Sequence, residues 1–327
     1  MWNTILNKMN HKTLPTRAIV LWGGQTDSLK LISEGINIVY QFTINNDIFY
    51  LRITHAKLRS EKELVAAICF QNYLYEKNVP VCQPILSKYS HWFERIEDDN
   101  EIYLVHVCKE VLGNTITFDG NAKLYFNWGK SLGLLHQAAL QFSYQASQYV
   151  SWDESLDELA KYVKQEETYI QRIFEQVNYF FRNKPVTTFN FGLTHGDHRE
   201  GNILAHHHNA FFIDFDLPSR NWFMDDFCRP FFDAISYGKN TWQNIFNDYK
   251  NGYFSVMPKE SLNLDTESFV RQYQFKALEI YLWMKNNWAG DIAPGGANTN
   301  LWLNAIYHQL SHEDNVINLF TKMPRDN

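Results

Sequence analysis

The chain has 327 residues, 45% of them hydrophobic and 20% charged, with a formal net charge of −6. This composition supports a large folded core and argues against intrinsic disorder. The acidic balance argues against sequence-independent nucleic-acid binding, and no apolar run approaches the ~20 residues that a membrane span needs.

The first part of the chain predicts a small antiparallel β lobe with one helix. Strands are expected at 29–33, 36–44 and 48–54, followed by a helix at 60–77. Two further strands are expected at 85–93 and 102–108. Two polar turns join neighbouring strands, Asn45-Asn46-Asp47 and Asp98-Asp99-Asn100. Asn and Asp tolerate left-handed backbone, so both segments favour tight hairpins.

After Lys109 the pattern changes from strands to helices. Long helices are expected over 122–145 and 153–182, followed by a loop, strand, turn and strand over 193–216. The rest reads as helices, with breaks near Asn251-Gly252 and Pro294-Gly295-Gly296. Three consecutive histidines, 206–208, favour a hairpin turn over a metal cluster, because consecutive strand residues point to opposite faces.

The four cysteines form no C-x-x-C pair, and all lie in apolar surroundings: Cys69, Cys82, Cys108 and Cys228. We therefore expect four free, buried thiols in a reducing compartment. The first residues do not resemble a secretory signal. Together these features predict a cytoplasmic protein.

The most informative stretch is 195–202, H-G-D-H-R-E-G-N. Asp197 is followed five residues later by Asn202, and Asp214 then follows the apolar run 211–213. An acid, an amide and a second acid at the end of a strand supply one base and two oxygen ligands for a divalent metal. Transfer of a nucleotide γ-phosphoryl group needs this set.

This motif resembles the catalytic loop of the aminoglycoside phosphotransferase and choline kinase-like family, whose members share the protein-kinase-like fold. Segments within 63–85, 129–136 and 271–284 are similar to type II homoserine kinases and stress-response kinases, and the likeness spans 29–290. The resemblance implies a bilobal α+β fold. Residues 1–108 would form a nucleotide-binding β lobe, and residues 109–327 a helical lobe with the catalytic loop and acceptor site.

The resemblance also implies roles in the helical lobe. Asp197 would act as base or orienting acceptor, and Asn202 and Asp214 would bind Mg²⁺. His195 and Asp226 would support the loop by hydrogen bonds. Asp216 would contact metal or acceptor, with a solvated turn as the alternative.

In the β lobe the resemblance implies a nucleotide site for ATP. Gly35 lies in the candidate phosphate-covering turn, although that turn has a single glycine and also reads as an ordinary hairpin. Arg52 would grip phosphate. Glu63 would either pair with Arg52 or close a capping box at the start of its helix. The backbone of Val105 and Val107 would read adenine at the hinge.

The predicted reaction is phosphoryl transfer from ATP to a hydroxyl of a small molecule, such as an amino alcohol, amino acid, sugar or aminoglycoside. Two alternatives stay open, a protein Ser/Thr kinase of the stress-response type and a catalytically idle nucleotide-binding module. Aromatic residues near the C-terminus would form either a cage for an amine or ordinary core: Tyr281, Trp283, Trp288 and Trp302. The sequence leaves the acceptor, the choice of ATP or GTP, and the oligomeric state open.

Overall fold

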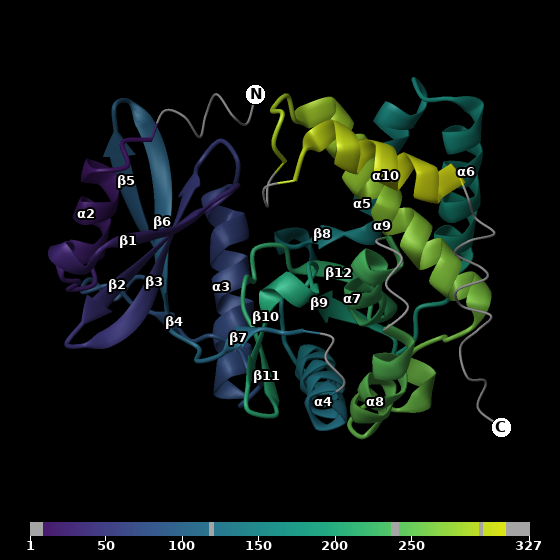
Figure 1. The fold of residues 1–327 in the computed structure, drawn as a ribbon, viewed down its shortest axis with the longest axis horizontal. Helices are drawn as coiled ribbons and strands as arrows, with labels where there is room; N and C mark the ends of the chain where they lie inside the picture. The colour runs from purple at the N-terminus through teal and green to yellow at the C-terminus, as the bar shows by residue number, and fades with distance from the viewer. Residues whose placement is uncertain (1–8, 118–120, 237–241, 294–296, 312–327) are drawn as a thin grey trace. The chain divides into compact units, whose positions relative to one another are not determined.

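The structure is a computed structural model that describes residues 9–117, 121–236, 242–293 and 297–311. It divides into two compact units, residues 1–112 with 287–299, and residues 113–286 with 300–327 (Figure 1). Strands dominate the first unit and helices the second, which confirms the predicted α+β fold class.

In the described residues, the first unit is a six-stranded antiparallel sheet with strand order β1-β2-β3-β6-β4, and β5 also pairs with β6. Its elements are α2 (Thr13–Val20), η1 (Thr26–Ser28), β1 (Lys30–Glu34), β2 (Ile38–Ile44), β3 (Asp47–His55), α3 (Glu61–Glu76), β4 (Pro84–Ile85), β5 (Glu94–Asp98) and β6 (Glu101–Lys109).

The two longer helices of this unit cover opposite faces of the sheet (Figure 1). Tyr103, Val105 and Val107 of β6 belong to one core cluster with α2, whereas Leu104 packs with Leu64 of α3. This division follows from the alternation of side chains along a strand. Helix α2 has no counterpart among the predicted elements, because eight residues with a proline at the third position show too little helical periodicity.

The predicted turns and the helix of this unit are confirmed. Asn45 and Asn46 have φ of 50° and 72°, and Asp99 and Asn100 have φ of 50° and 62°. The predicted helix over 60–77 is α3, whose N-cap residue is Ser60. Tight left-handed turns and N-caps are local features, so the sequence identifies them without knowledge of the rest of the fold.

The predicted strand over 85–93 is wrong. Only Pro84–Ile85 pairs with β6, and the next strand begins at Glu94. Between them Ser87 organises a turn: its N–H donates to the His91 carbonyl at 2.8 Å, and its hydroxyl accepts the N–H of Tyr89 at 3.1 Å. These local hydrogen bonds, one from the backbone and one to the Ser87 side chain, compete with strand pairing despite the aromatic composition of the segment.

The second unit joins two three-stranded sheets to a set of helices. One sheet has the order β11-β10-β7, and in the other β12 runs parallel to β8 and antiparallel to β9. Its elements are β7 (Asn114–Thr115), α4 (Ala122–Ala139), η2 (Ala146–Gln148), β8 (Val150–Ser151), α5 (Trp152–Val163), α6 (Thr168–Asn183), β9 (Phe191–Thr194), η3 (Glu200–Asn202), β10 (Ile203–His206), β11 (Asn209–Phe212), β12 (Ser219–Trp222), α7 (Met224–Ser236), α8 (Trp242–Phe254), η4 (Lys259–Ser261), α9 (Thr266–Asn287) and α10 (Thr299–Ser311). The histidines form the predicted hairpin turn, with φ of 56° at His207.

Two helix predictions need correction. The segment 153–182 is two helices, α5 and α6, separated near Glu166, whose carboxylate is held by Lys285 of α9 at 2.8 Å. No glycine or proline marks this break, so the sequence carried no signal for it. The break expected at Asn251-Gly252 is absent from this described segment, because α8 continues to Phe254. The break expected at 294–296 lies outside the described residues.

Glycine stays inside α8 because this helix packs against the backbone of α4. A Cβ added to Gly252 would lie 1.8 Å from the carbonyl oxygen of Phe126, and one added to Gly129 would lie 1.8 Å from that of Tyr249. Backbone atoms of the two helices therefore approach at both glycines, and neither position has room for a larger residue.

We expect Gly252→Ala to lower the free energy of unfolding by about 2 kcal/mol, because the added methyl group forces two helix backbones apart. Urea unfolding followed by tryptophan fluorescence measures the change. Gly35→Ala is the matched control, since a Cβ there meets only the Asn37 oxygen at 3.7 Å. Equal stabilities of the two variants would contradict the proposed contact.

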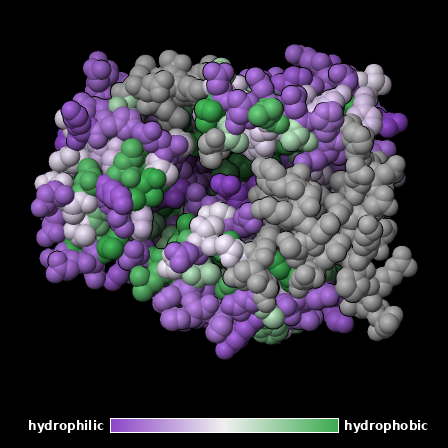
Figure 2. All heavy atoms as spheres, in the orientation of Figure 1, coloured by the Kyte–Doolittle hydropathy of each residue, from purple (hydrophilic) through white to green (hydrophobic). Residues whose placement is uncertain are grey.

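None of the four cysteines, which all lie in the described residues, forms a disulfide bond, and Cys82, Cys108 and Cys228 are buried. Cys69 is exposed, contrary to expectation, because it lies on the side of α3 away from Leu64 and Ile68. Figure 2 shows apolar side chains in small groups among polar ones on the face in view. Within the described ranges, no helix has both the length and the apolar character needed to cross a membrane.

Candidate active site

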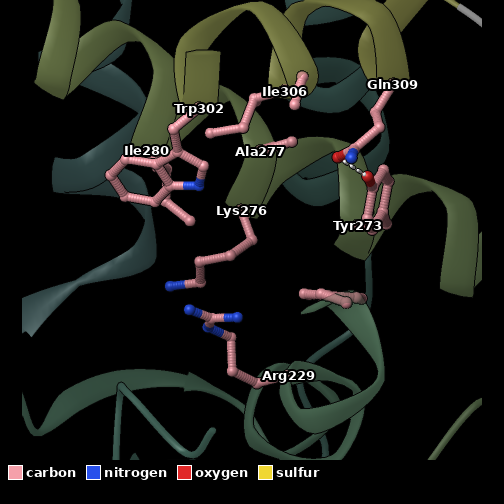
Figure 3. Close-up of a pocket in the computed structure, with 10 residues that line it drawn as sticks. Arg229, Tyr273, Lys276, Ala277, Ile280, Trp302, Ile306 and Gln309 are labelled. Carbon is pink, nitrogen blue, oxygen red and sulfur yellow. Dashed lines mark hydrogen bonds between the residues drawn. The ribbon is translucent and has the colours of Figure 1, made fainter. Parts of the chain in front are cut away.

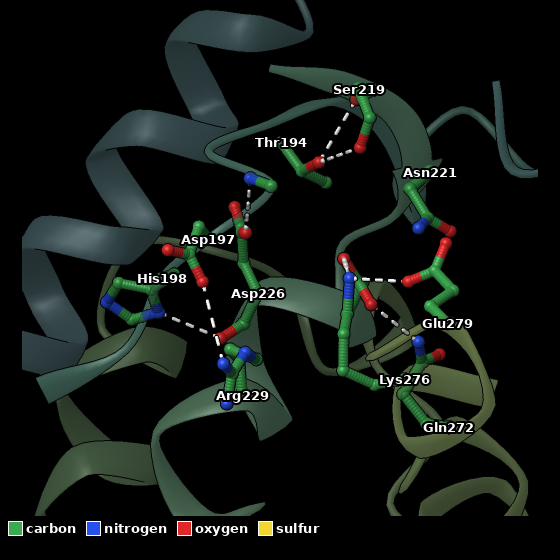
Figure 4. A network of polar contacts seen from close by, with 12 residues as sticks. Thr194, Asp197, His198, Ser219, Asn221, Asp226, Arg229, Gln272, Lys276 and Glu279 are labelled. Carbon is green, nitrogen blue, oxygen red and sulfur yellow. Dashed lines mark hydrogen bonds and ion pairs between the residues drawn. The ribbon is translucent and has the colours of Figure 1, made fainter. Parts of the chain in front are cut away.

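The loop that begins at residue 195 is fastened at its start by one buried carboxylate (Figure 4). The side chain of Asp226 in α7 accepts the backbone N–H of His195 at 2.6 Å and that of Gly196 at 3.0 Å. Gly196 has φ of 82°, and a Cβ there would lie 1.8 Å from the Leu217 carbonyl oxygen. Only glycine fits this position, so Asp226 and Gly196 together determine where the loop starts.

The backbone carbonyl of Asp226 also holds the loop, because a proline in α7 leaves it without its usual helical hydrogen bond. Pro230 lies inside α7 and has no N–H, so it cannot bond the Asp226 carbonyl four residues earlier. That carbonyl instead accepts Nδ1–H of His198 at 2.8 Å, and the Trp128 indole donates to His198 Nε2 at 2.9 Å. Because an indole can only donate, His198 is neutral with its proton on Nδ1. Burial lowers the pKa of His198 to about 4, although Asp226 opposes the shift.

Asp226 stays ionised in this buried position. Its Oδ2 accepts Nε2–H of His136 at 3.2 Å, and His136 Nδ1 accepts the Tyr253 hydroxyl at 2.9 Å. Burial by itself raises the pKa of Asp226, but the hydrogen bond from His136 leads the effects that outweigh it and lower the pKa to about 2. The His136 ring stacks on Phe223 with centroids 4.1 Å apart, which holds its orientation.

Asp197 is surrounded by two guanidinium groups and an amide, and its side chain is 28% exposed. Its Oδ1 lies 3.6 Å from Arg229 Nη2, and its Oδ2 accepts Arg199 Nε at 3.2 Å and Asn202 Nδ2 at 2.9 Å. Burial raises the pKa of Asp197, but Arg229 and Arg199 outweigh burial, so the pKa lies below its ordinary value. Asp197 is therefore an anion at neutral pH and a weak base.

Backbone hydrogen bonds bring Asn202 and Asp214 into the same cluster. Ile213 donates its N–H to the Asn202 carbonyl at 3.0 Å and accepts His195 Nε2–H at 3.0 Å on its own carbonyl. Asp214, the next residue, has φ of 68°, a left-handed conformation that is uncommon outside glycine and often marks functional positions. Because Asn202 Nδ2 donates to the Asp197 carbonyl and carboxylate, its amide oxygen is turned away from Asp197.

Asp216 lies on the segment that leads from this cluster to β12, and its side chain is half-buried. It follows Phe215, whose ring lies 4.4 Å from the His195 ring. The structure therefore places Asp216 beside the loop, and both of its predicted roles, ligand contact or solvated turn, stay open.

Three charged residues that the sequence analysis did not single out extend this network: Arg229, Asp225 and Lys276 (Figure 4). Asp225 accepts Gln272 Nε2 at 2.8 Å and lies 3.8 Å from Lys276 Nζ, which contacts Glu279 at 2.8 Å. Burial raises the pKa of Asp225 to about 6 against the effect of Lys276. One signal could have revealed Arg229, because it stands in the apolar run F-C-R-P-F-F and a buried arginine needs a carboxylate partner.

In the first unit, Gly35 and Arg52 lie on neighbouring parts of the sheet. Gly35 connects β1 to β2, and its N–H donates to the Asn37 carbonyl at 3.1 Å. Arg52 lies in β3 opposite Val39 and His106. The residues on either side of Arg52 belong to the α2 core cluster, so Arg52 lies on the α3 face of the sheet.

Of the two predicted roles of Glu63, the structure contains the helix cap. Its Oε2 accepts both the backbone N–H and the hydroxyl of Ser60 at 2.7 Å, and the Ser60 hydroxyl accepts the Glu63 N–H at 3.2 Å.

The hinge expected at Val105 and Val107 is wrong, because both lie inside β6. Val105 is paired with β3 on one side and β5 on the other, and Val107 with β3 and β4. Their backbone groups are committed to the sheet and cannot read a base. The strand continues to Lys109, beyond both residues.

The aromatic residues near the C-terminus are divided between the two units. Trp288 belongs to the first unit, whereas Tyr281 and Trp302 belong to the second. The Tyr281 ring already has a cation, Lys285 Nζ, 5.4 Å from its centroid. Trp302 lines a cavity in the second unit.

The fold has close relatives among solved small-molecule kinases. A solved amicoumacin kinase in complex with AMP-PNP, Ca²⁺ and Ami matches with a TM-score of 0.80 and 20% identity, over 96% of each chain. The microcompartment-associated aminopropanol kinase matches with a TM-score of 0.71 and 15% identity, over 95% of this chain and 96% of that chain. These likenesses confirm the predicted protein-kinase-like fold.

Comparison of amino-acid sequences also finds similarity to a kinase. Amicoumacin kinase of Bacillus subtilis (strain 168) is 25% identical over 228 residues, which cover 67% of this chain and 67% of that protein. Residues 28–261 match the sequence model of the phosphotransferase enzyme family. Because this match covers well over half of the chain, the chain belongs to the phosphotransferase enzyme family.

Proposed function

We propose that this protein transfers the γ-phosphoryl group of ATP to a hydroxyl of a small molecule, with Mg²⁺ as the metal. The observation that carries the proposal is the convergence of Asp197, Asn202 and Asp214 in one loop cluster of a phosphotransferase-family chain. In the reaction the acceptor oxygen bonds to the γ-phosphorus, the bond to the bridging oxygen breaks, ADP leaves, and the hydroxyl proton passes to Asp197 or to solvent.

The donor set of the cluster fits Mg²⁺. Among the described residues, no three His, Cys, Asp or Glu side chains are grouped to hold a metal. Asn202 and Asp214 supply hard oxygens from two positions only, and Mg²⁺ in such sites takes its other ligands from phosphates and water. The bound ion would neutralise charge on the transferred phosphoryl group. That the related amicoumacin kinase was solved with AMP-PNP and Ca²⁺ supports this assignment.

Asp197 would orient the acceptor hydroxyl. The cations that contact it keep it ionised, and its weak basicity suits a loose transition state in which the proton leaves late. Its hydrogen bond from Asn202 also joins the acceptor-orienting group to a metal ligand. His195 and Asp226 would keep this arrangement rigid through the bonds described above.

We further propose that residues 1–108 bind the nucleotide and residues 109–327 carry the chemistry. Arg52 would grip phosphate from the α3 face of its sheet, and the turn with Gly35 would cover the phosphates. Four cysteines outside any disulfide bond, all in the described residues, support a cytoplasmic location.

Asp214→Ala tests the proposal. We expect it to weaken nucleotide binding at least ~10-fold when Mg²⁺ is present, because the metal loses its carboxylate ligand. Nucleotide binding without Mg²⁺ should be unchanged. Isothermal titration with a non-hydrolysable ATP analogue, with and without Mg²⁺, measures both quantities.

Two results would favour the alternatives. Equal effects of Mg²⁺ on wild type and Asp214→Ala would indicate that this acid holds no metal. Phosphorylation of the chain itself or of a protein, with no turnover of any small hydroxyl compound, would favour a protein kinase.

A further inference from the structure

A small cavity lies in the second unit next to a residue that contacts Asp197 (Figure 3). Its volume is about 40 Å³, room for one small chemical group, whereas sites for drug-sized ligands have ~300 Å³ or more. Its lining comes from α7, α9 and α10 and includes Arg229, Tyr273, Lys276, Ile280, Trp302 and Ile306.

Two cations face one another in this cavity. Figure 3 shows the guanidinium of Arg229 and the ammonium of Lys276 pointing toward each other, with Trp302 and Ile280 forming an apolar wall. The two basic side chains are only 9% and 15% exposed. Burial and the charge of Arg229 lower the pKa of Lys276, but Asp225 and Glu279 outweigh both and raise it, so Lys276 keeps its positive charge beside Arg229.

The carboxylates that balance these cations lie outside the cavity. Arg229 contacts Asp197, and Lys276 contacts Asp225 and Glu279. None of these three acids lines the cavity, whose described lining is two cations and apolar or neutral side chains. A ligand that enters therefore meets positive charge and apolar surface. An anionic group between the two cations would relieve their repulsion and accept charge-assisted hydrogen bonds from both.

We propose that Arg229 and Lys276 form a subsite for an anionic group of the acceptor, so that the phosphorylated molecule is a hydroxy acid. This inference rests on the proposed phosphotransferase function. Arg229 Nη2 lies 3.6 Å from Asp197, so a hydroxyl at Asp197 and a carboxylate at Arg229 belong to one short molecule. The same charge disfavours acceptors that would place an amine in this cavity.

The subsite can be tested by binding alone, with isobutyrate and isobutyramide as probes for the full chain. The two have nearly the same shape, and only isobutyrate is charged. We expect isobutyrate to bind at least ~10-fold more tightly, measured by NMR-detected titration, because its oxygens accept hydrogen bonds from two cations. Equal affinities, tighter binding of the amide, or no binding of either probe would overturn the proposal.

Substitutions then assign the preference to this cavity. Lys276→Gln should remove most of the advantage of isobutyrate, whereas Lys276→Arg, which keeps the charge, should retain it. Trp302→Ala should weaken both probes to a similar extent, since it removes only apolar wall. A full acid preference in folded Lys276→Gln would overturn the proposal. If Lys276→Gln does not fold, Arg229→Gln makes the same comparison.

A second experiment tests whether the subsite affects phosphoryl transfer, by comparing kcat/KM for acid and amide acceptors. With ATP and Mg²⁺, glycerate and serine should be phosphorylated with a higher kcat/KM than glyceramide and serinamide. Turnover of the amides in preference to the acids would overturn the subsite and leave the proposed function standing. Failure of every acceptor, with nucleotide binding indifferent to Mg²⁺, would overturn the proposed function, while the isobutyrate titration would still decide the subsite.

Discussion

Replacing Asp197 by Ala is expected to lower turnover at least ~10²-fold while nucleotide affinity stays nearly unchanged. The carboxylate is proposed to hold the acceptor hydroxyl in line with the transferred phosphoryl group. Loss of that orientation affects the transition state and not the binding of ATP. The variant should remain folded, because the loop is fastened through Asp226 and not through Asp197.

The charges around Asp197 also predict the result for a second variant, Asp197→Asn. Arg229 and Arg199 hold its pKa below the ordinary value, so it has already lost its proton at any pH where the enzyme would work. Asp197→Asn should therefore lose nearly as much turnover as Asp197→Ala, because the amide keeps the shape but not the charge.

The measurement is steady-state turnover with saturating acceptor, together with titration of the nucleotide. Glu200→Gln is the matched control, because it removes an acid three residues further along the same loop and should keep turnover close to that of wild type. If Asp197→Ala kept more than about a tenth of wild-type turnover, the proposed role would be wrong.

Local features of this chain were predictable from the sequence, because they depend on a few neighbouring residues. The turns at Asn45-Asn46 and Asp99-Asn100 follow from the tolerance of these residues for positive φ. The capping box of Ser60 and Glu63 follows from a four-residue pattern. The 195–202 motif carries its chemistry in its spacing, so the sequence alone predicts the candidate site.

Features that depend on distant partners were not predictable. The pairing of Val107 on both sides of β6 requires knowledge of β3 and β4, so a hinge was placed inside a strand. Arg229 and Lys276 face one cavity only because α7 and α9 pack together. The role of Pro230, which frees a carbonyl for His198, likewise appears only when the loop is seen against α7.

Replacing Asp226 by Asn is expected to lower the free energy of unfolding by about 3 kcal/mol or more at pH 7. The Asp226 carboxylate accepts two backbone N–H groups and the His136 ring inside the protein. An amide has only one acceptor oxygen and directs its own N–H groups toward one of these donors. At least one buried donor then loses its partner, and the loop start at His195 loosens with it.

The adjacent acid provides a matched control. Asp225 is equally buried in the same turn of α7, but burial raises its pKa to about 6. Its charge therefore opposes folding at neutral pH, and Asp225→Asn keeps an oxygen to accept Gln272 Nε2. We expect Asp225→Asn to change the free energy of unfolding by no more than about 1 kcal/mol.

The pH at which the two variants are compared decides what the experiment measures. The pKa of Asp226 falls from 3.8 to about 2 on folding, so its stabilising contribution is present above pH 3.8 and is lost only as the pH falls through 2. For Asp225 the sign is opposite: the contribution of its protonated form is complete below pH 3.8 and is lost as the pH rises through 6. Urea unfolding at pH 7 therefore measures the whole loss in Asp226→Asn and only the removal of an unfavourable charge in Asp225→Asn. If both variants lost a similar free energy of unfolding, the burial of an acid in this turn would determine stability here, and not the fastening of the loop by Asp226.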